Sequence, residues 1–476
     1  MKTKYSSYLK KVQKPLQDLV KILNNHYSYV SILATDCKGT SFQVSQRRKN
    51  VSDYYLSERG FVARVYRDGL YSEYSFNILD ENNIDELAAK IIAKMDEQLA
   101  LLQITNSEIY TTAEIQEKEE TLFVEKEVGI LPETIAVEEL VEKLTNISNK
   151  GIALSDKVID FVTTAAYFHV NKLFVSTKKC MAQSYVFAEG MLGALVRNES
   201  RTDMDYHAYS GLKGAELFDE MEKDVEEVVK NGLELLEAQR VVPGEYDIIT
   251  TPEVSGLIAH EAFGHGVEMD MFVKKRALAA DYIGKRVASD LVDMHEGALV
   301  AENTCSFEFD DEGTLAGDVT EIKAGILNTG IVDALSALRL GIEPTGNGKR
   351  QSFERKAYTR MTNTVFMGGT STVDEMIASI EHGYLLDGMK SGMEDPKHWG
   401  IQCILSKGRE IKNGKLTGVV VSPVILTGYV PDLLKSISMV SEKVEIHGSG
   451  SCGKGYKEWV KAAEGGPHLK AKGRLG

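Results

Sequence analysis

The sequence predicts an α+β fold, in which an N-terminal region of antiparallel sheet and helices precedes a β-rich C-terminal domain that carries a metal-binding helix. Apolar residues recur at helical spacing over 9–25 and 80–102, whereas residues 28–77 alternate with a period of two. Beyond residue 239, short β-like runs alternate with many glycines. A chain of 476 residues is long enough for two or three domains. We predict three: an α+β module at 1–104, a second α+β module with a linker and a long helix at 105–238, and a β-rich domain at 239–476.

In the first module, two predicted helices enclose a predicted sheet. The first helix contains Pro15, which either begins or kinks it, because proline fits only the first turn of a helix without distortion. Turn signals such as Asp68-Gly69 divide residues 28–77 into four or five antiparallel strands. The helix over 80–102 completes the module.

The central module begins with a polar stretch, residues 105–134, which we interpret as a solvated linker. Helical spacing returns over 137–148 and in a long charged helix over 216–237. The strands expected between them are 158–168, 172–175 and 181–197. The run Val241-Val242-Pro243-Gly244 ends the long helix and marks the main boundary of the chain.

In the last module, a strand over 246–251 leads to Pro252-Glu253, which opens a helix because proline is favoured in the first helical turn. Two further helices are predicted at 374–382 and 431–437. The short strands are predicted at 305–309, 325–327, 365–367, 400–405 and 419–423. The charged stretch Asp310-Asp311-Glu312-Gly313 predicts a solvated hairpin turn rather than a cation site.

Charge and cysteine usage narrow the class of protein. The formal net charge is −15 and the isoelectric point is near 5.3, so no direct nucleic-acid partner is expected. The first twenty residues lack the apolar core of a signal peptide, and no window approaches 18 consecutive apolar residues, so no membrane span is expected. Five dispersed cysteines without a C-x-x-C pair are typical of a reducing compartment, which predicts a cytoplasmic location.

The run His260-Glu261-Ala262-Phe263-Gly264-His265 carries the clearest chemical signal. Two imidazoles are good zinc ligands, and a glutamate beside the first can act as a base toward a water at the metal. The zinc-protease motif H-E-x-x-H spaces its histidines by four, whereas here they are five apart. On a regular helix that places the rings roughly 140° apart. They can share a metal only if the helix contains a π-bulge or ends near Gly264.

A glycine-rich loop, Gly448 to Gly455, provides a further ligand. It superficially resembles a phosphate-binding loop but lacks the Gly-Lys-Ser/Thr ending. A cysteine on such a loop, Cys452, can approach a metal closely, and Lys454 beside it is expected to hold the thiolate. Spacing alone leaves other third ligands open: Glu268, Asp270, His295 and His447.

Five motifs occurring in order resemble the TldD branch of the TldD/PmbA family, whose members are also called modulators of DNA gyrase. They are HEAFGHGVEMD at 260–270, DDEG at 310–313, TGNGKR at 345–350, RMTN at 360–363 and GSCGKG at 450–455. The resemblance covers residues 260–455, and the earlier modules fit the family more loosely.

The resemblance implies a zinc metallopeptidase, with 239–476 as its metallopeptidase domain. It makes His260, His265 and Cys452 the metal ligands and Glu261 the general base. It also implies a peptidase that hydrolyses unfolded peptides or small proteins. The expected partner is a metal-free paralogous subunit in a heterodimer, or a second copy in a homodimer.

The chemistry that follows leaves some roles open. The sequence does not identify the oxyanion donor; Asn363, Arg360 and His447 are candidates that also fit structural roles. Peptide is expected to bind as an added strand on an exposed sheet edge. Two other functions fit: a non-catalytic interaction partner of the gyrase-modulator type, and a zinc amidohydrolase that acts on a non-peptide amide.

Overall fold

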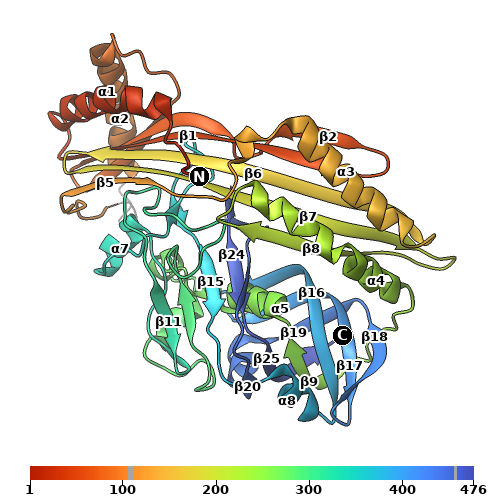
Figure 1. Ribbon diagram of the computed structural model, residues 1–476. Helices are drawn as coiled ribbons and strands as arrows, with labels where there is room; N and C mark the ends of the chain where they lie inside the picture. The colour runs from red at the N-terminus through yellow and green to blue at the C-terminus, as the bar shows by residue number, and fades with distance from the viewer. Residues whose placement is uncertain (106–110, 455–457) are drawn as a thin grey trace.

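The computed structural model describes residues 1–105, 111–454 and 458–476, and it confirms the predicted α+β class. Two β-rich regions lie one above the other in Figure 1. None of the described helices combines the length and apolar character needed to cross a bilayer.

The N-terminal region is one large sheet of eight strands, in the order β4-β3-β1-β6-β7-β5, with β2 paired to β1 and β8 paired to β7. The strands are β1 Tyr29–Val44, β2 Lys49–Asp53, β3 Glu58–Arg67, β4 Leu70–Phe76, β5 Glu120–Glu125, β6 Val158–Ser176, β7 Lys179–Arg197 and β8 Thr202–Gly211. Residues 31–44 of β1 pair with residues 163–176 of β6, so the predicted division at residue 104 runs through a shared sheet.

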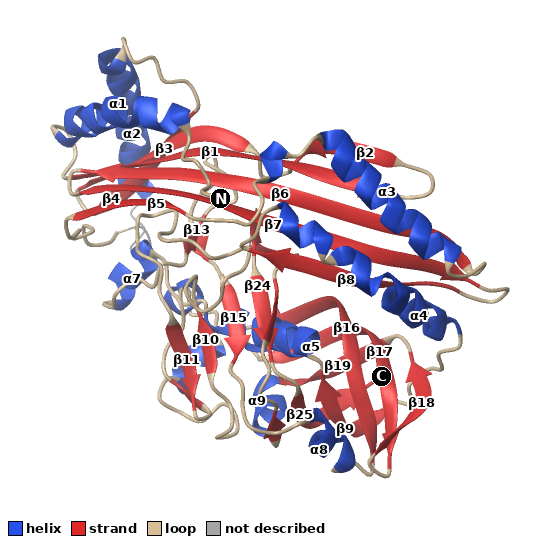
Figure 2. Ribbon diagram, in the orientation of Figure 1, coloured by secondary structure: helices blue, strands red, loops and turns tan. Residues whose placement is uncertain are grey.

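Helices cover this sheet in two groups, as Figure 2 shows. α1 (Ser7–Asn24) and α2 (Ile84–Thr105) pack against β1 and β3, and α1 continues through Pro15 from its cap at Ser6. α3 (Val137–Ala153) and α4 (Val225–Leu236) pack against β6 and β7. The apolar spacing that predicted these helices is the face that they bury.

Several predictions for this region are wrong in detail. The predicted linker contains β5, which pairs in parallel with β7, and the short helix η1 (Pro132–Thr134); residues 106–110 of that linker lie outside the described part. The two strands predicted at 158–168 and 172–175 are one strand, β6. The predicted helix over 216–237 begins as two 3₁₀ turns, η2 (Ala215–Asp219) and η3 (Met221–Asp224), before α4.

The C-terminal region is built around a small barrel. Its strands run in the order β16-β9-β25-β19-β17, and β16 pairs with β17 to close it; β18 and β20 pair at its sides. These strands are β9 Gly244–Thr250, β16 His382–Asp395, β17 Gly400–Lys412, β18 Lys415–Val421, β19 Val424–Tyr429, β20 Met439–Val440 and β25 Leu469–Leu475. Buried apolar residues of the barrel and of the helix after β9 form the largest core cluster.

A second sheet of six strands, in the order β12-β11-β10-β15-β24-β21, packs beside the barrel. It is made by β10 Met294–Glu296, β11 Val319–Lys323, β12 Ile326–Leu327, β15 Asn363–Phe366, β21 Glu445–His447 and β24 Ala463–Gly466. Two hairpins complete the region: β13 (Gly348–Lys349) with β14 (Tyr358–Thr359), and β22 (Ser451–Lys454) with β23 (Glu458–Lys461). Its other helices are α6 Asp270–Val273, η6 Leu278–Tyr282, α7 Ala334–Leu340, α8 Val373–Ala378 and α9 Val430–Lys435.

Two predictions for the C-terminal region are wrong. Residues 305–309 form no strand, and the stretch Asp310-Asp311-Glu312-Gly313 is buried rather than solvated. Glu312 forms an ion pair with Arg64 of β3 at 2.6 Å, and Asp311 forms an ion pair with Lys172 of β6. This turn therefore fastens the C-terminal region to the N-terminal sheet.

Candidate metal centre

The two histidines lie on a helix that changes its winding between them. α5 (Pro252–Leu257) is followed by a π-helical turn, η4 (Ile258–Gly264), and then by a 3₁₀ turn, η5 (His265–Val267). The His265 N–H donates to the carbonyl of His260, five residues earlier. This wider turn brings the imidazoles to the same side, with ring centroids 5.1 Å apart.

Cys452 reaches the same place from β22. Its Sγ lies 3.4 Å from Nε2 of His265, and one donor atom from each of His260, His265 and Cys452 lies within 4.8 Å of the other two. The Cys452 backbone carbonyl accepts a hydrogen bond of 2.7 Å from the Arg360 guanidinium, which fixes the strand behind the sulfur. Residues 260–265 and 452 are thus brought together by the fold.

A carboxylate stands behind each imidazole. Nδ1 of His265 lies 3.2 Å from Oε2 of Glu268. Nδ1 of His260 lies 3.2 Å from Oε2 of Glu464, although without hydrogen-bond alignment. Carboxylates in this position orient metal-binding histidines and set the tautomer that leaves the other nitrogen free. Glu464 comes from β24, and nothing in its local sequence marked it in advance.

The alternative third ligands occupy other positions. Glu268 is behind His265 and pairs with Lys454 at 3.0 Å, while Asp270 pairs with the same lysine at 2.7 Å. Lys454 therefore holds these carboxylates, and the prediction that it holds the Cys452 thiolate is wrong. Nδ1 of His295 lies 2.7 Å from Oδ1 of Asp318, which immediately precedes β11.

The cluster polarises its own members. Burial raises the pKa of Cys452, but the imidazoles of His260 and His265 outweigh it and lower that pKa to about 4. Burial disfavours charge on the imidazoles, but the Cys452 thiolate raises the pKa of His265 to about 10 and that of His260 well above its usual range. Positive charge is therefore stabilised around the sulfur, where a cation would also be held.

The cluster lies in an open cleft of about 1800 Å³. Glu261 faces this cleft, with Oε2 at 4.0 Å from Nε2 of His265. One wall is β16: its residues 383–386 pair with β9, whereas residues 389–395 pair only with β17 within the described chain. The second part of β16 is therefore a sheet edge that lines the cleft beside Glu261.

None of the three candidate oxyanion donors lies free in this cleft: two have structural partners, and the third lines another cavity. Asn363 donates to the Gly297 carbonyl at 3.0 Å, and Arg360 is bound to the carbonyls of Cys452 and Glu458. His447 lines a different cavity. A carboxyl that the sequence reasoning missed, Glu394, lies on the β16 edge, where burial raises its pKa well above the usual range.

Comparison with known proteins assigns the class first. Residues 243–469 match the family of the PmbA/TldA metallopeptidase C-terminal domain. This range of the chain includes the three predicted metal ligands and the predicted base. This C-terminal region is thus similar to a metallopeptidase domain. More particularly, the matched domain is that of the PmbA/TldD type.

Individual relatives agree with this placement. The chain is 28% identical over 288 residues to a metalloprotease of Methanothermobacter thermautotrophicus, across 60% of this chain and 62% of that protein. It is 29% identical over 230 residues to a zinc metalloprotease TldD homologue of Saccharolobus solfataricus, across 48% of this chain and 51% of that protein. The chain therefore spans about half to three fifths of the lengths of these two relatives.

The fold is also found among solved structures. The crystal structure of TldE from Thermococcus kodakarensis superposes with a TM-score of 0.72, covering 97% of this chain and 99% of that one. The two sequences are 18% identical, so this likeness concerns the fold.

Proposed function

We propose that the protein is a zinc-dependent peptidase whose metal is held by His260, His265 and Cys452, with Glu261 as the general base. The observation that carries the proposal is the convergence of two imidazole nitrogens and one sulfur within 4.8 Å in an open cleft. Two nitrogens and a thiolate suit zinc, and three protein ligands leave a position for substrate or water. The carboxylates behind both imidazoles support the same assignment.

The chain's own residues account for the rest of the chemistry. When bound, zinc would activate water and polarise the scissile carbonyl. Glu261 would take the proton from the attacking water and return it to the leaving amine, a role that typically contributes 10²–10⁴-fold. Glu268 and Glu464 would keep the imidazoles oriented. Thiolate ligation donates more charge than a third imidazole does, so we expect a modest turnover.

The β16 edge supports peptide as the substrate. A peptide laid along residues 389–395 would add a strand, with backbone hydrogen bonds that give little sequence specificity. Extended chains alone can pair in this way, which favours unfolded peptides or small unfolded proteins. The proposed partner is a metal-free paralogous subunit or a second copy, and TldE is the name of one solved protein of this fold.

The test is zinc content with matched variants. We expect near-stoichiometric zinc in the purified chain, measured by elemental analysis, and its loss in Cys452→Ala and His265→Ala. Cys180→Ala and His295→Ala, which remove the same chemical groups elsewhere, should retain it. A chain that takes up no zinc on reconstitution would contradict the proposal.

Activity separates peptidase from the other functions. Glu261→Gln should keep its zinc and lose at least 100-fold in the cleavage rate of unfolded peptides, because only the proton acceptor is removed. An enzyme that cleaves small non-peptide amides but no peptide would be an amidohydrolase. A zinc-loaded chain inactive on both classes, alone and with its paralogue, would be an interaction partner.

A further inference from the structure

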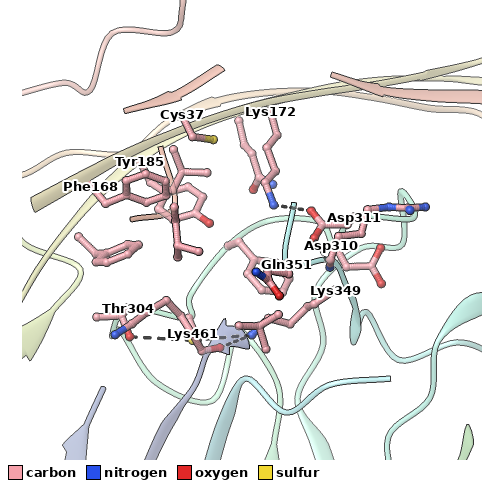
Figure 3. A pocket seen from close by; sticks show the side chains of 18 of the residues that line it. Cys37, Phe168, Lys172, Tyr185, Thr304, Asp310, Asp311, Lys349, Gln351 and Lys461 are labelled. Atoms are coloured by element: carbon pink, nitrogen blue, oxygen red, sulfur yellow. Dashed lines mark hydrogen bonds and ion pairs between the residues drawn. The ribbon is translucent and has the colours of Figure 1, made fainter. Parts of the chain in front are cut away.

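A second cavity lies between the N-terminal sheet and the C-terminal region, with a volume of about 700 Å³ (Figure 3). We call it the interdomain cavity. It adjoins the hairpin of β22 and β23, and Trp459 of that hairpin lines both this cavity and the cleft of the metal centre.

One wall of the interdomain cavity is aromatic. Phe168 of β6 and Phe187 of β7 pack with ring centroids 5.5 Å apart, and Tyr185 lies beside them. The Tyr185 hydroxyl makes no hydrogen bond to any residue in the described part of the chain, and Figure 3 shows the ring at the cavity. This wall suits an apolar body of about the size of an amino-acid side chain.

The lysines that line the interdomain cavity differ in their partners. Lys172 is paired with Asp311, and Lys461 is paired with Glu189 at 2.6 Å. Lys349 has no carboxylate within ion-pair distance among the residues described. A buried ammonium without a counterion is costly, and burial lowers its pKa.

The hydrogen bonds of Lys349 leave one weak position. Its Nζ donates to the carbonyls of Met361, at 3.0 Å, and Lys461, at 2.6 Å. The third contact is to Sγ of Cys305, at 3.8 Å, and a thiol is a weak acceptor. A carboxylate entering the cavity would supply both a stronger acceptor and the missing charge.

We propose that the interdomain cavity binds an apolar residue bearing a carboxylate, with the apolar body against Phe168, Tyr185 and Phe187 and the carboxylate on Lys349. Two sources share this chemistry: the carboxy-terminal residue of a peptide that passes Trp459 from the cleft, and a free apolar acid. The assignment of the ligand to a peptide terminus rests on the proposed function. The binding of an apolar carboxylate to the cavity does not depend on it.

The experiment is calorimetric titration of the metal-free full chain, so its result is independent of peptidase activity. The probes are N-acetyl-L-phenylalanine and its carboxamide, which differ only in the negative charge. We expect the acid to bind at least tenfold more tightly than the amide. Lys349→Met should remove this preference, and Lys415→Met, at an exposed lysine, should preserve it.

Val170→Phe provides a second variant that removes no polar contact. Val170 lines the interdomain cavity, so the larger side chain should fill it and weaken binding of both probes at least tenfold. If circular dichroism shows that Lys349→Met does not fold, the proposal is tested by Val170→Phe and by the difference in affinity between the acid and the amide. Equal binding of acid and amide, absence of binding, or full binding by Val170→Phe would overturn the proposal.

The two sources are separated with a hexapeptide that ends in phenylalanine. If it binds at least tenfold more tightly than N-acetyl-L-phenylalanine, and the gain disappears when its terminal carboxylate is amidated, the ligand is a peptide terminus. Equal affinity of the peptide and the small acid assigns the cavity to a free apolar acid.

Discussion

The carboxylates behind the histidines show how single side chains far apart in sequence make the candidate site. Glu464 lies 3.2 Å from Nδ1 of His260, and Glu268 lies 3.2 Å from Nδ1 of His265. Such residues are known to matter in metal sites because a free imidazole rotates and changes tautomer.

We expect Glu464→Gln to weaken zinc binding by about 10–100-fold, because the amide is a poorer partner for Nδ1 of His260. Competition with a chelator of known affinity measures this change. Glu445→Gln, on the neighbouring strand, removes an equal charge whose partner is the exposed Lys443 and should leave affinity as in the wild type. Equal affinities of Glu464→Gln and the wild type would show that the carboxylate does not orient the ring.

Glu58 gives a prediction about pH. Burial raises its pKa to about 7, although the Phe353 N–H that it accepts acts in the opposite direction. Between its ordinary pKa of 4.5 and 7, the folded chain keeps a proton that the unfolded chain has released. Stability from this group is therefore present below about pH 4.5 and is lost as pH rises to 7. Glu58→Gln should show a smaller fall in melting temperature between pH 5 and pH 7.5, and parallel curves would contradict this.

At the scale of elements, the winding of η4 and the course of β16 place Glu261. Gly392 of β16 lies directly against it, since an added Cβ at Gly392 would meet Cγ of Glu261 at 2.5 Å. A side chain there must displace either the base or the strand.

We therefore expect Gly392→Ala to lower the peptide cleavage rate at least tenfold while zinc content stays unchanged. Gly400→Ala is the matched control, because an added Cβ at Gly400 of β17 meets nothing within 4 Å. Steady-state kinetics and elemental analysis on both variants test this. A fully active Gly392→Ala would mean that Glu261 is not the base or has room to move.

Element by element, prediction succeeded where a pattern was local. Strong apolar spacing identified α1 and α2, and the five-residue separation of His260 and His265 named a π-helical turn as one of two solutions. Prediction failed where a strand pairs with a distant part of the chain. The residues of β5 were interpreted as a polar linker, because the partner strand, β7, is more than fifty residues away. Long-range pairing leaves little trace in one strand's composition.

For the candidate site, the residues whose chemistry is distinctive were predicted, and those defined by position were not. Cys452 was selected through its glycine-rich loop and a family resemblance. Glu464 and the β16 edge depend on how the barrel and the second sheet meet, which no local pattern encodes.

At the scale of the molecule, buried ion pairs join the two regions. Arg64 of β3 pairs with Glu312 at 2.6 Å and with Glu73 at 2.7 Å, and Glu73 also binds Arg350 of the C-terminal region. The local charge of residues 310–313 predicted a solvated turn. The sequence alone does not show that Arg64, on a distant strand, pairs with Glu312.

We expect Arg64→Met to destabilise the protein by about 3–5 kcal/mol, because it leaves Glu312 buried without its cation. Differential scanning calorimetry should show a lower melting temperature for the transition that includes both regions. Lys11→Met breaks an exposed pair with Glu81 and should leave the melting temperature close to that of the wild type, because solvent screens such a pair. Similar effects of the two variants would argue that the buried pairs do not couple the regions.

The distance along the chain between the histidines and the cysteine also matters during biosynthesis. Cys452 follows His265 by 187 positions. At about 5–20 residues per second, the ribosome adds the sulfur roughly 10–40 s after the imidazoles. A nascent chain thus carries the helix with His260 and His265 for many seconds before Cys452 is added. Under the proposed function, proteolysis begins only once translation has delivered β22, which spares neighbouring nascent chains from a half-made enzyme.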